Sequence, residues 1–596
     1  MNERGLRELI QQVARGQLTR RAFVQTMAGL GLAAPLAGQM LAAAGIASAQ
    51  PKDAGFVPIR RGGGGDLRML MWDAPTLLNP HFGRGLRDFT ASRIFYEPLA
   101  APTSEGTFAP ILAEEMPSLA NGGVAKDGQW VIWRLKKNVQ WHDGAPFTAA
   151  DVIFNWEFAS DPATASNSRG VYEEISRIDR LDTHTVKVVF KKPQPFWAVA
   201  FTGDGLIPRH IFEPLRGGGA KEAVGMVKPV GTGPYRLVEF RPGDMIRAEL
   251  NPTYHVPNRP YFDRLEIKCG GDAVGAARAV LQTGEYDFAY YVLVEEEVLR
   301  RIEQGGKGRV LAVPASGVSH IQCNQSDPWR DVDGERSSAR SSHPFLTDPT
   351  IRQAIGLLID RASIQEHLVG RAGQITANIL NAPERYRSRA TTWEFNPDRA
   401  NAILDQAGWA RGADGIRAKD GRRLKVLFQA ATNATVQKTQ AVVKQAAARA
   451  GIEVEVKAVP ASVFFSGDAN NPDANIRFLA DLQMYTVFTG LDPLFFMAQY
   501  VSWEIPTKEN KFTGRNTTRW RNAEYDRLWR RAEVEMDPVK RAAHFIRMND
   551  LVVQHGVVIP VTWRNVIHAA GTQLAGVELN GWDSIFGRIA YWYRQS

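Results

Sequence analysis

Apolar and polar positions divide the chain into two differently patterned stretches. From residue 66 to about 270, short runs such as TVKVVFKK and MIRAELN alternate the two kinds of position, with few helical segments between them. This pattern predicts a mixed α+β region with substantial antiparallel sheet. Later, a strand at 426–430, a helix ending near Gly451 and a strand at 452–459 predict a βαβ crossover, and so a parallel α/β lobe.

Several predicted helices begin with the same signal, an Asp or Asn cap followed directly by proline. Such a cap accepts a hydrogen bond from the first turn, and proline suits the first helical position because it has no N–H. The signal occurs at Asp348-Pro349, Asn396-Pro397 and Asp537-Pro538. Asp420-Gly421, between two further strand-like runs, predicts a hairpin turn.

The stretch WHDGAPFTAADVIFNWEF, residues 141–158, places a histidine beside an aspartate and so raises the question of catalysis. Asp143-Gly144 predicts a turn, and Thr148 with Asp151 resembles a capping box at the start of a helix. His142 and Asp143 are adjacent just before this turn, so we expect their side chains to diverge. The pattern favours an architectural role, and a catalytic His–Asp pair stays open because such pairs are recognised by geometry.

The first fifty residues have the features of an export signal. Arg20-Arg21 precede a mildly apolar run rich in Ala and Gly, which ends in Ala47-Ser48-Ala49. This pattern predicts a Tat-type signal peptide over residues 1–49, cleaved after Ala49, with a membrane anchor as the alternative. Residues 50–65 contain four consecutive glycines and are predicted to be a flexible linker. The mature protein is therefore expected in the periplasm.

Composition and charge exclude several classes of function. The chain of 596 residues has a formal net charge of +9, but its basic residues are dispersed, so nucleic-acid binding is not expected. The two cysteines, Cys269 and Cys323, have neither CxxC spacing nor histidine partners nearby. They are interpreted as isolated buried thiols, with a disulfide as the alternative in an exported protein.

Motifs of catalysis and metal binding are absent from the sequence. No HExxH, GxSxG or GxxxxGK[ST] string occurs, and the eleven histidines lack the i, i+4 spacing of a helical metal site. A distant pair of carboxylates meeting in the fold stays open. We therefore expect no catalytic residues, no metal and no cofactor, and binding is favoured over turnover.

An ordered series of segments resembles a known family. The segments include WRLKKNVQWHDGAPFTAADVIFNWEF at 133–158, PVGTGPYRLVEF at 229–240, HPFLTDPTIRQAIGLLIDRASI at 343–364 and ANAILDQAGW at 400–409. They follow one another in order from about residue 67 to 590. In this order they resemble the family 5 extracellular solute-binding proteins of ABC importers, the dipeptide-, oligopeptide- and nickel-binding group.

The resemblance implies an α/β fold with mixed α+β and α/β lobes, arranged as a periplasmic-binding-protein-like bilobal clamshell with an extra insertion lobe. The implied lobes are 66–99 with 201–312 and 559–596 (lobe I), 100–200 (the insertion lobe II) and 313–558 (lobe III). Connecting segments near Pro314 and Pro560 would form the hinge. Ligand would contact both large lobes only in the closed state, and so would shift the population toward closure.

The resemblance also implies candidate ligand contacts. The loop MYTVFTGLDPLFF at 484–496 would line the pocket, with Tyr485 and Phe488 as stacking walls and Asp492 as a polar anchor or a loop-shaping residue. Peptide-binding members often carry an aspartate before this Asp-Pro to pair with a free amine, whereas this chain has Thr489. Further candidates, with packing or loop structure as the equal alternative, are Trp72, Asp73, Asn324 and Trp563.

These observations predict a periplasmic substrate-binding protein that hands a peptide-like or other small polar solute to an ABC permease. The expected partners are the membrane permease subunits and the Tat export machinery, and the protein is expected to be monomeric. Two alternatives come from other classes. One is an exported hydrolase on a multi-lobed scaffold, and the other is a chemoreceptor-type binding protein.

Overall fold

The computed structural model describes residues 56–595 except Arg84, 223–227, Asp333, Gly467 and Ala469, together with four isolated positions, 12, 13, 23 and 26. The predicted twin arginines and the cleavage site after Ala49 lie outside the described residues. None of the described helices is both long and apolar enough to span a bilayer.

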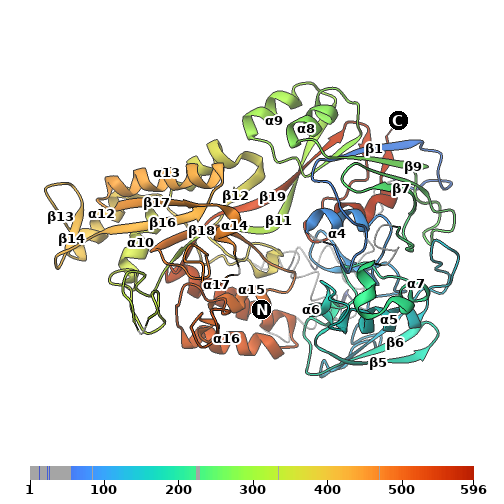
Figure 1. Cartoon of the computed structure of the whole chain (residues 1–596), viewed down its shortest axis with the longest axis horizontal. Coiled ribbons are helices and arrows are strands. Elements are labelled where there is room, and N and C mark those ends of the chain that lie inside the picture. The colour runs from blue at the N-terminus through green and yellow to red at the C-terminus, as the bar shows by residue number, and fades with distance from the viewer. Residues whose placement is uncertain are drawn as a thin grey trace. The chain divides into compact units, whose positions relative to one another are not determined.

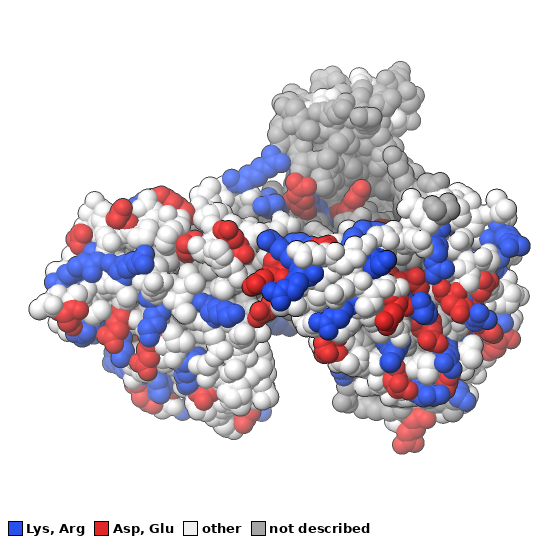
Figure 2. Space-filling view, turned by 90° about the horizontal axis from the view of Figure 1, so that it is seen from above, with Lys and Arg blue, Asp and Glu red and all other residues white. Residues whose placement is uncertain are grey.

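On the face seen in Figure 2, basic and acidic side chains are interspersed, in keeping with the dispersed charges of the sequence.

The chain forms two compact units, which are described separately. Unit 1 contains the residues up to Val313 and from Val566 onward, and unit 2 contains Pro314–Asn565. The boundaries fall inside two long strands, β11 (Gly308–Cys323) and β19 (Val558–Gly571). The predicted hinge position at Pro314 lies at the first boundary, and Pro560 lies in the same strand as the second. The finer division into three lobes stays a prediction.

Unit 1 is a mixed α+β unit, as the alternating sequence pattern predicts. Its strands are β1 (Asp66–Met71), β2 (Ala100–Pro102), β3 (Phe108–Pro110), β4 (Trp130–Arg134), β5 (Ile175–Asp182), β6 (Thr185–Phe190), β7 (Tyr235–Arg241), β8 (Met245–Leu250), β9 (Arg264–Cys269), β10 (Phe288–Tyr290), β20 (Leu574–Ala575) and β21 (Tyr593–Arg594). Its helices are α4 (Leu86–Ser92), α5 (Ala149–Ser160), α6 (Arg169–Tyr172), α7 (Arg209–Phe212), α8 (Ala273–Leu281) and α9 (Glu296–Glu303).

In the main sheet of unit 1, every second side chain of the first strand, β1, is buried. β1 pairs in parallel with β9 and β10, while β8 pairs antiparallel with both β9 and β7. Leu67, Met69 and Met71 point to one face of β1 and enter the core. A second sheet, in the order β4-β6-β5, is antiparallel and has its own hydrophobic core with α5.

The second half of the predicted linker belongs to the folded unit 1. Gly62 and Gly64 donate backbone hydrogen bonds to the carbonyls of Pro260 and Tyr261. The Asp263 carboxylate accepts two more backbone bonds, from Gly63 and Gly65, each 2.8 Å long. The flexible-linker prediction is therefore wrong for residues 56–65, because the backbone N–H groups of the glycines find acceptors in the segment 260–263.

Unit 2 has the predicted α/β organisation. Its strands are β12 (Gly373–Ile375), β13 (Ala410–Arg411), β14 (Arg417–Lys419), β15 (Arg422–Arg423), β16 (Lys425–Ala431), β17 (Glu453–Val459) and β18 (Leu482–Phe488). Its helices are α10 (Pro349–Leu357), α11 (Arg361–Ile364), α12 (Pro397–Gln406), α13 (Ala434–Arg449), α14 (Ala461–Phe464), α15 (Leu494–Met497), α16 (Ala523–Val534) and α17 (Pro538–Gln554).

The sheet of unit 2 is covered by helices on both faces (Figure 1). Its strands follow the order β17-β16-β18-β11-β19, and β16 pairs in parallel with both β17 and β18. The unit β16-α13-β17 is the βαβ crossover predicted from the sequence. One core lies between the sheet and the helices α10, α12 and α13. A second core lies among α15, α16 and α17.

The predicted local signals are present in the structure. Asp348, Asn396 and Asp537 cap α10, α12 and α17 through their side chains. Thr148 and Asp151 form the reciprocal capping box of α5. Asp420 and Gly421, both with positive φ, turn the chain between β14 and β15.

Both cysteines are buried free thiols. Cys269 lies in unit 1 and Cys323 in unit 2, and burial raises the pKa of each thiol to about 12. The isolated-thiol interpretation is therefore confirmed, and the disulfide alternative is wrong.

Candidate functional site

The histidine and aspartate of the stretch at 141–158 have different partners. His142 is buried, and burial lowers its pKa to about 4. Its Nδ1 accepts a 3.2 Å hydrogen bond from the backbone N–H of Gly231, and its Nε2 lies 3.0 Å from the carbonyl oxygen of Gly233. Asp143 instead contacts His210 Nε2 at 2.6 Å near the surface. The side chains diverge, and His142 attaches the turn to the loop before β7.

The loop proposed to line the pocket leaves the end of β18, and its two aromatic residues lie on opposite faces of the sheet. β18 pairs with β11 in unbroken register, from Cys323 opposite Leu482 to Gly317 opposite Phe488. Side chains alternate between faces along such a strand, so Tyr485 and Phe488 point in opposite directions. They therefore cannot form two walls of one pocket within unit 2, which corrects the expectation of paired stacking walls.

The surroundings of the two rings differ as well. Tyr485 packs edge-to-face against His320, with ring centroids 4.9 Å apart, and also contacts Phe464 and Phe465. Loss of hydration raises the pKa of its phenol to about 12. Phe488 lies over Gly317, where a Cβ atom would come within 2.9 Å of its ring, and 66% of Phe488 is exposed. Of the two, Phe488 is the ring open to a ligand.

The polar residues of this loop are engaged in its structure. Asp492 forms an ion pair with the buried Arg541 of α17, with Nη2 and Oδ2 2.9 Å apart, and its Oδ1 accepts a 3.2 Å bond from the backbone N–H of Leu494. Thr489 is buried, and its backbone N–H donates to the carbonyl of Ser316 at 3.3 Å. The contacts of Asp492 support its loop-shaping alternative.

The other candidates also make structural hydrogen bonds. In unit 1, Trp72 Nε1 donates to the Tyr291 carbonyl at 2.6 Å, and Asp73 pairs with Arg87 at 3.0 Å. In unit 2, the indole N–H of Trp563 donates to the carbonyl of Ala315. Asn324 is fully buried, with both its amide nitrogen and its oxygen bonded within the unit. Asn324 is therefore a structural residue, because a ligand would have to displace these bonds.

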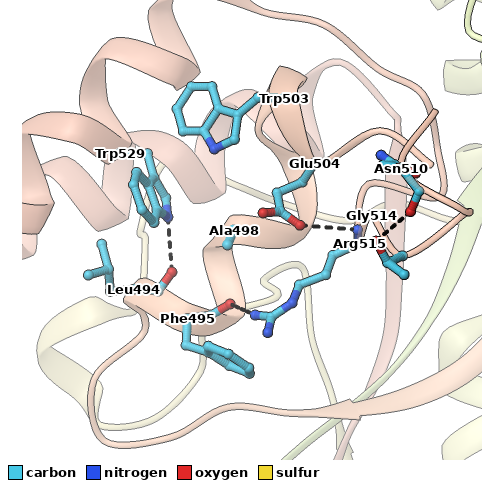
Figure 3. Close-up of a pocket in the computed structure, with 10 residues that line it drawn as sticks. Leu494, Phe495, Ala498, Trp503, Glu504, Asn510, Gly514, Arg515 and Trp529 are labelled. Atoms are coloured by element: carbon cyan, nitrogen blue, oxygen red, sulfur yellow. Dashed lines mark hydrogen bonds between the residues drawn. The ribbon is translucent and has the colours of Figure 1, made fainter. Parts of the chain in front are cut away.

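A cavity of about 560 Å³ lies within unit 2, and the last part of the same loop contributes to its lining. It begins at Leu494 and Phe495, directly after Asp492-Pro493, and continues along the segment 503–515. Trp503 and Trp529 form an edge-to-face pair with centroids 5.6 Å apart, and the Trp529 indole donates to the Leu494 carbonyl at 3.0 Å. Figure 3 shows these side chains around the cavity. Its size is within the range of small-molecule sites.

Two residues of opposite charge line this cavity. The guanidinium of Arg515 lies 3.5 Å above the ring of Phe495, and its Nη1 donates to the Phe495 carbonyl at 3.3 Å. Among the described residues, the Glu504 carboxylate accepts one long bond, of 3.4 Å, from the backbone N–H of Arg515. Burial lowers the pKa of Arg515, and the nearby charge of Glu504 raises it by a smaller amount.

The loop at 484–496 contains the cavity residues Leu494 and Phe495, but no sequence motif marked the remaining cavity residues. WEIPTKENKFTGR mixes aromatic and charged residues but matches no motif, and only the fold brings it to α15 and α16. One local signal is Gly514, because a Cβ there would lie 2.3 Å from the carbonyl oxygen of Glu504. The glycine lets the two backbone segments approach and places Arg515 beside Glu504. Among the described residues, no group of three or more His, Cys, Asp or Glu could hold a metal ion.

Comparison with known proteins relates this chain to binding proteins. The family profile described as "Bacterial extracellular solute-binding proteins, family 5 Middle" matches residues 107–503. The glutathione-binding protein GsiB of Shigella dysenteriae is 24% identical over 507 residues, which cover 84% of this chain and 89% of that protein. The oligopeptide-binding protein AppA of Bacillus subtilis is 26% identical over 478 residues, 79% of this chain and 81% of AppA.

The fold is similar to that of a solved binding protein. The ABC transporter substrate-binding protein CtaP from Listeria monocytogenes superposes with a TM-score of 0.72 at 20% identity, over 89% of this chain and 100% of CtaP. The mixed α/β periplasmic-binding-protein fold expected from the sequence is thereby confirmed. The chain belongs to the family 5 bacterial extracellular solute-binding proteins and is the non-enzymatic solute-binding component of an ABC transporter.

Proposed function

We propose that this protein captures a peptide-like solute in the periplasm and delivers it to the permease subunits of its transporter. The names of two relatives, a glutathione-binding and an oligopeptide-binding protein, support this class of solute. The observation that carries the proposal is the cavity in unit 2, which combines indole walls with one cation and one anion. Peptides offer complementary groups, namely apolar side chains, amides and charged ends.

The proposed capture step is a closure of the two units about β11 and β19. Two boundaries, inside these two strands, separate the units, and hinges of this kind consist of a few residues that change φ and ψ. Phe488 of unit 2 and Trp72 with Asp73 of unit 1 are proposed ligand contacts in the closed state. Peptide-binding members of the family often have an aspartate before this Asp-Pro that pairs with the free amine of a peptide, and this chain has Thr489 there. We therefore expect another residue to bind the amine.

Export and assembly complete the proposal. The protein leaves the cytoplasm through the Tat machinery, its signal peptide is cleaved after Ala49, and it acts as a monomer. Replacing Arg20-Arg21 by Lys-Lys tests the export route, and the full-length precursor is expected to accumulate in the cytoplasm. Processing that is unchanged in a host without a Tat translocase would contradict this route.

The binding function is tested by native mass spectrometry of the mature protein purified from the periplasm of its native host. An intact peptide-like molecule is expected in complex with the protein. Small-angle scattering with and without that molecule is expected to show a smaller radius of gyration in the complex. A retained molecule that is not peptide-like, or superimposable scattering curves, would refute the solute class or the closure respectively.

A further inference from the structure

The opposite charges in the cavity of unit 2 do not neutralise each other. Across the described residues, the side chains of Glu504 and Arg515 form no ion pair with each other or with any other residue. Of the five N–H groups of the Arg515 guanidinium, one is bonded, from Nη1 to the Phe495 carbonyl. Both groups therefore keep hydrogen-bonding capacity within one cavity.

The fold places the Glu504 carboxylate and the Arg515 guanidinium in the same cavity without pairing them. The Arg515 guanidinium is placed over the ring of Phe495, which attracts a cation through its π face. Glu504 sits on the neighbouring segment, whose backbone approaches that of Gly514 closely. In Figure 3 the Glu504 carboxylate and the Arg515 guanidinium lie between Trp503 and Phe495. A single ligand can thus reach both charges.

Flat apolar surface flanks the charged pair. The indole N–H of Trp529 is bonded to the Leu494 carbonyl, so the ring serves as a wall and not as a donor. Trp503 is 42% exposed, and Arg530 stacks on it with its guanidinium carbon 4.2 Å from the ring centroid. A wall of this kind suits an apolar or aromatic side chain of the ligand.

We infer that the cavity is a subsite for a short zwitterionic peptide: Glu504 receives its ammonium group, Arg515 receives its carboxylate, and Trp503 with Trp529 holds an apolar side chain between them. A ligand with both charges satisfies both protein groups, whereas an anion or a cation leaves one of them desolvated without a partner. Charge-assisted hydrogen bonds to each end would give the orientation. This inference rests on the proposed function and names the chemistry of its solute.

Isothermal titration calorimetry of the mature protein tests the subsite with defined probes. The probes are Gly-Phe, Gly-Leu and Gly-Gly-Phe, each as the free zwitterion, the N-acetyl form and the C-terminal amide. At least one zwitterion is expected to bind, and either blocked form is expected to bind about 10- to 100-fold more weakly. Equal binding of the free and blocked forms would overturn the inference.

Matched variants assign the two ends. Glu504→Gln is expected to weaken the free zwitterion about 10-fold or more and to leave the N-acetyl form unchanged. Arg515→Met is expected to weaken the free zwitterion by a similar factor and to leave the C-terminal amide unchanged. Arg515→Lys is expected to retain part of the affinity because it keeps the positive charge. Glu509→Gln and Arg521→Met are the controls, since neither residue lines the cavity. Wild-type affinity in both Glu504→Gln and Arg515→Met would refute the subsite.

The outcomes separate the subsite from the proposed function. If the molecule retained by the native protein is peptide-like and binds the two cavity variants as it binds the wild type, the solute class stands and the subsite is wrong. If the wild type binds neither that molecule nor any probe saturably, both proposals fail.

Discussion

Two neighbouring segments of unit 2 use their polar groups in opposite ways. In residues 485–492, part of the loop at 484–496 that the resemblance marked, Asp492 is paired with Arg541 and Thr489 is bonded to Ser316. In residues 503–515, which no motif marked, Glu504 and Arg515 face one cavity with most of their hydrogen-bonding capacity unused. The first segment is built to hold a shape, and the second presents chemistry.

A polar residue in the right loop is thus not yet a ligand contact. A carboxylate whose oxygens accept from a guanidinium and a backbone N–H has already been compensated for its loss of water, so a ligand gains little by displacing those partners. A partly exposed carboxylate with one long protein bond, such as Glu504, can exchange its remaining contact with water for a ligand without losing a protein partner. Hydrogen-bonding capacity left unused in a cavity is therefore the better sign of function.

The largest expected effect is on stability, from Asp492→Ala. The variant leaves the guanidinium of Arg541, whose side chain is 6% exposed, without its anion, so we expect a loss of about 3 kcal/mol in the free energy of unfolding. Urea denaturation measures it. A wild-type midpoint would mean that this segment is not held by the pair, and the contrast between the two segments would disappear.

Acid is expected to destabilise the enclosed side of β18. Burial lowers the pKa of His320, which packs on Tyr485, to about 4, while the unfolded chain titrates near 6.5. The unfolded state therefore binds a proton first, and stability falls as the pH drops from about 6.5 toward 4. Between pH 7.5 and 5 this histidine accounts for about 2 kcal/mol.

Urea denaturation at the two pH values checks this dependence. His320→Leu is expected to remove that share of the pH dependence, while the rest, from other buried histidines such as His142, remains. An identical pH dependence in the variant and the wild type would show that His320 is not kept neutral by burial.

Alanine substitutions at Gly514 and Gly490 test how closely the backbone is packed in the two segments. In Gly514→Ala the new Cβ meets the Glu504 carbonyl oxygen at 2.3 Å, so we expect a loss of roughly 1 to 2 kcal/mol, together with weaker peptide binding as Arg515 moves. The matched variant Gly490→Ala has its nearest neighbour at 3.6 Å, which is an ordinary contact. Thermal unfolding and calorimetry of both are the measurements, and equal behaviour of the two variants would contradict the close approach.

The smallest effect on the free energy of unfolding is expected for substitutions of Glu504 and Arg515, which form no ion pair among the described residues. Glu504→Gln removes no ion pair among the described residues, so the free energy of unfolding is expected to change by less than about 0.5 kcal/mol. Arg515→Met loses the contact with Phe495 and is expected to cost about 1 kcal/mol or less. A loss as large as that of Asp492→Ala in either variant would make these residues structural and would remove the difference between the segments.

Local sequence signals predicted the elements of this fold well, because each acts over a few residues. A cap such as Asp348 bonds to the turn that follows it, and the Asp420-Gly421 turn needs only its own backbone angles. The βαβ crossover of unit 2 follows from the order of strand, helix and strand. The path of residues 56–65 was mispredicted, because its partners lie some 200 residues further along the chain.

The sequence alone determined the two fold classes, the helix starts and the resemblance to a binding-protein family. Only the tertiary structure decided which side chains remain available to a ligand. Sequence cannot show that Asp492 meets Arg541 across 49 positions, or that Tyr485 and Phe488 face apart while Glu504 and Arg515 share a cavity. The physical reason is that hydrogen-bonding capacity is consumed by partners distant in the chain, and folding alone brings those partners together.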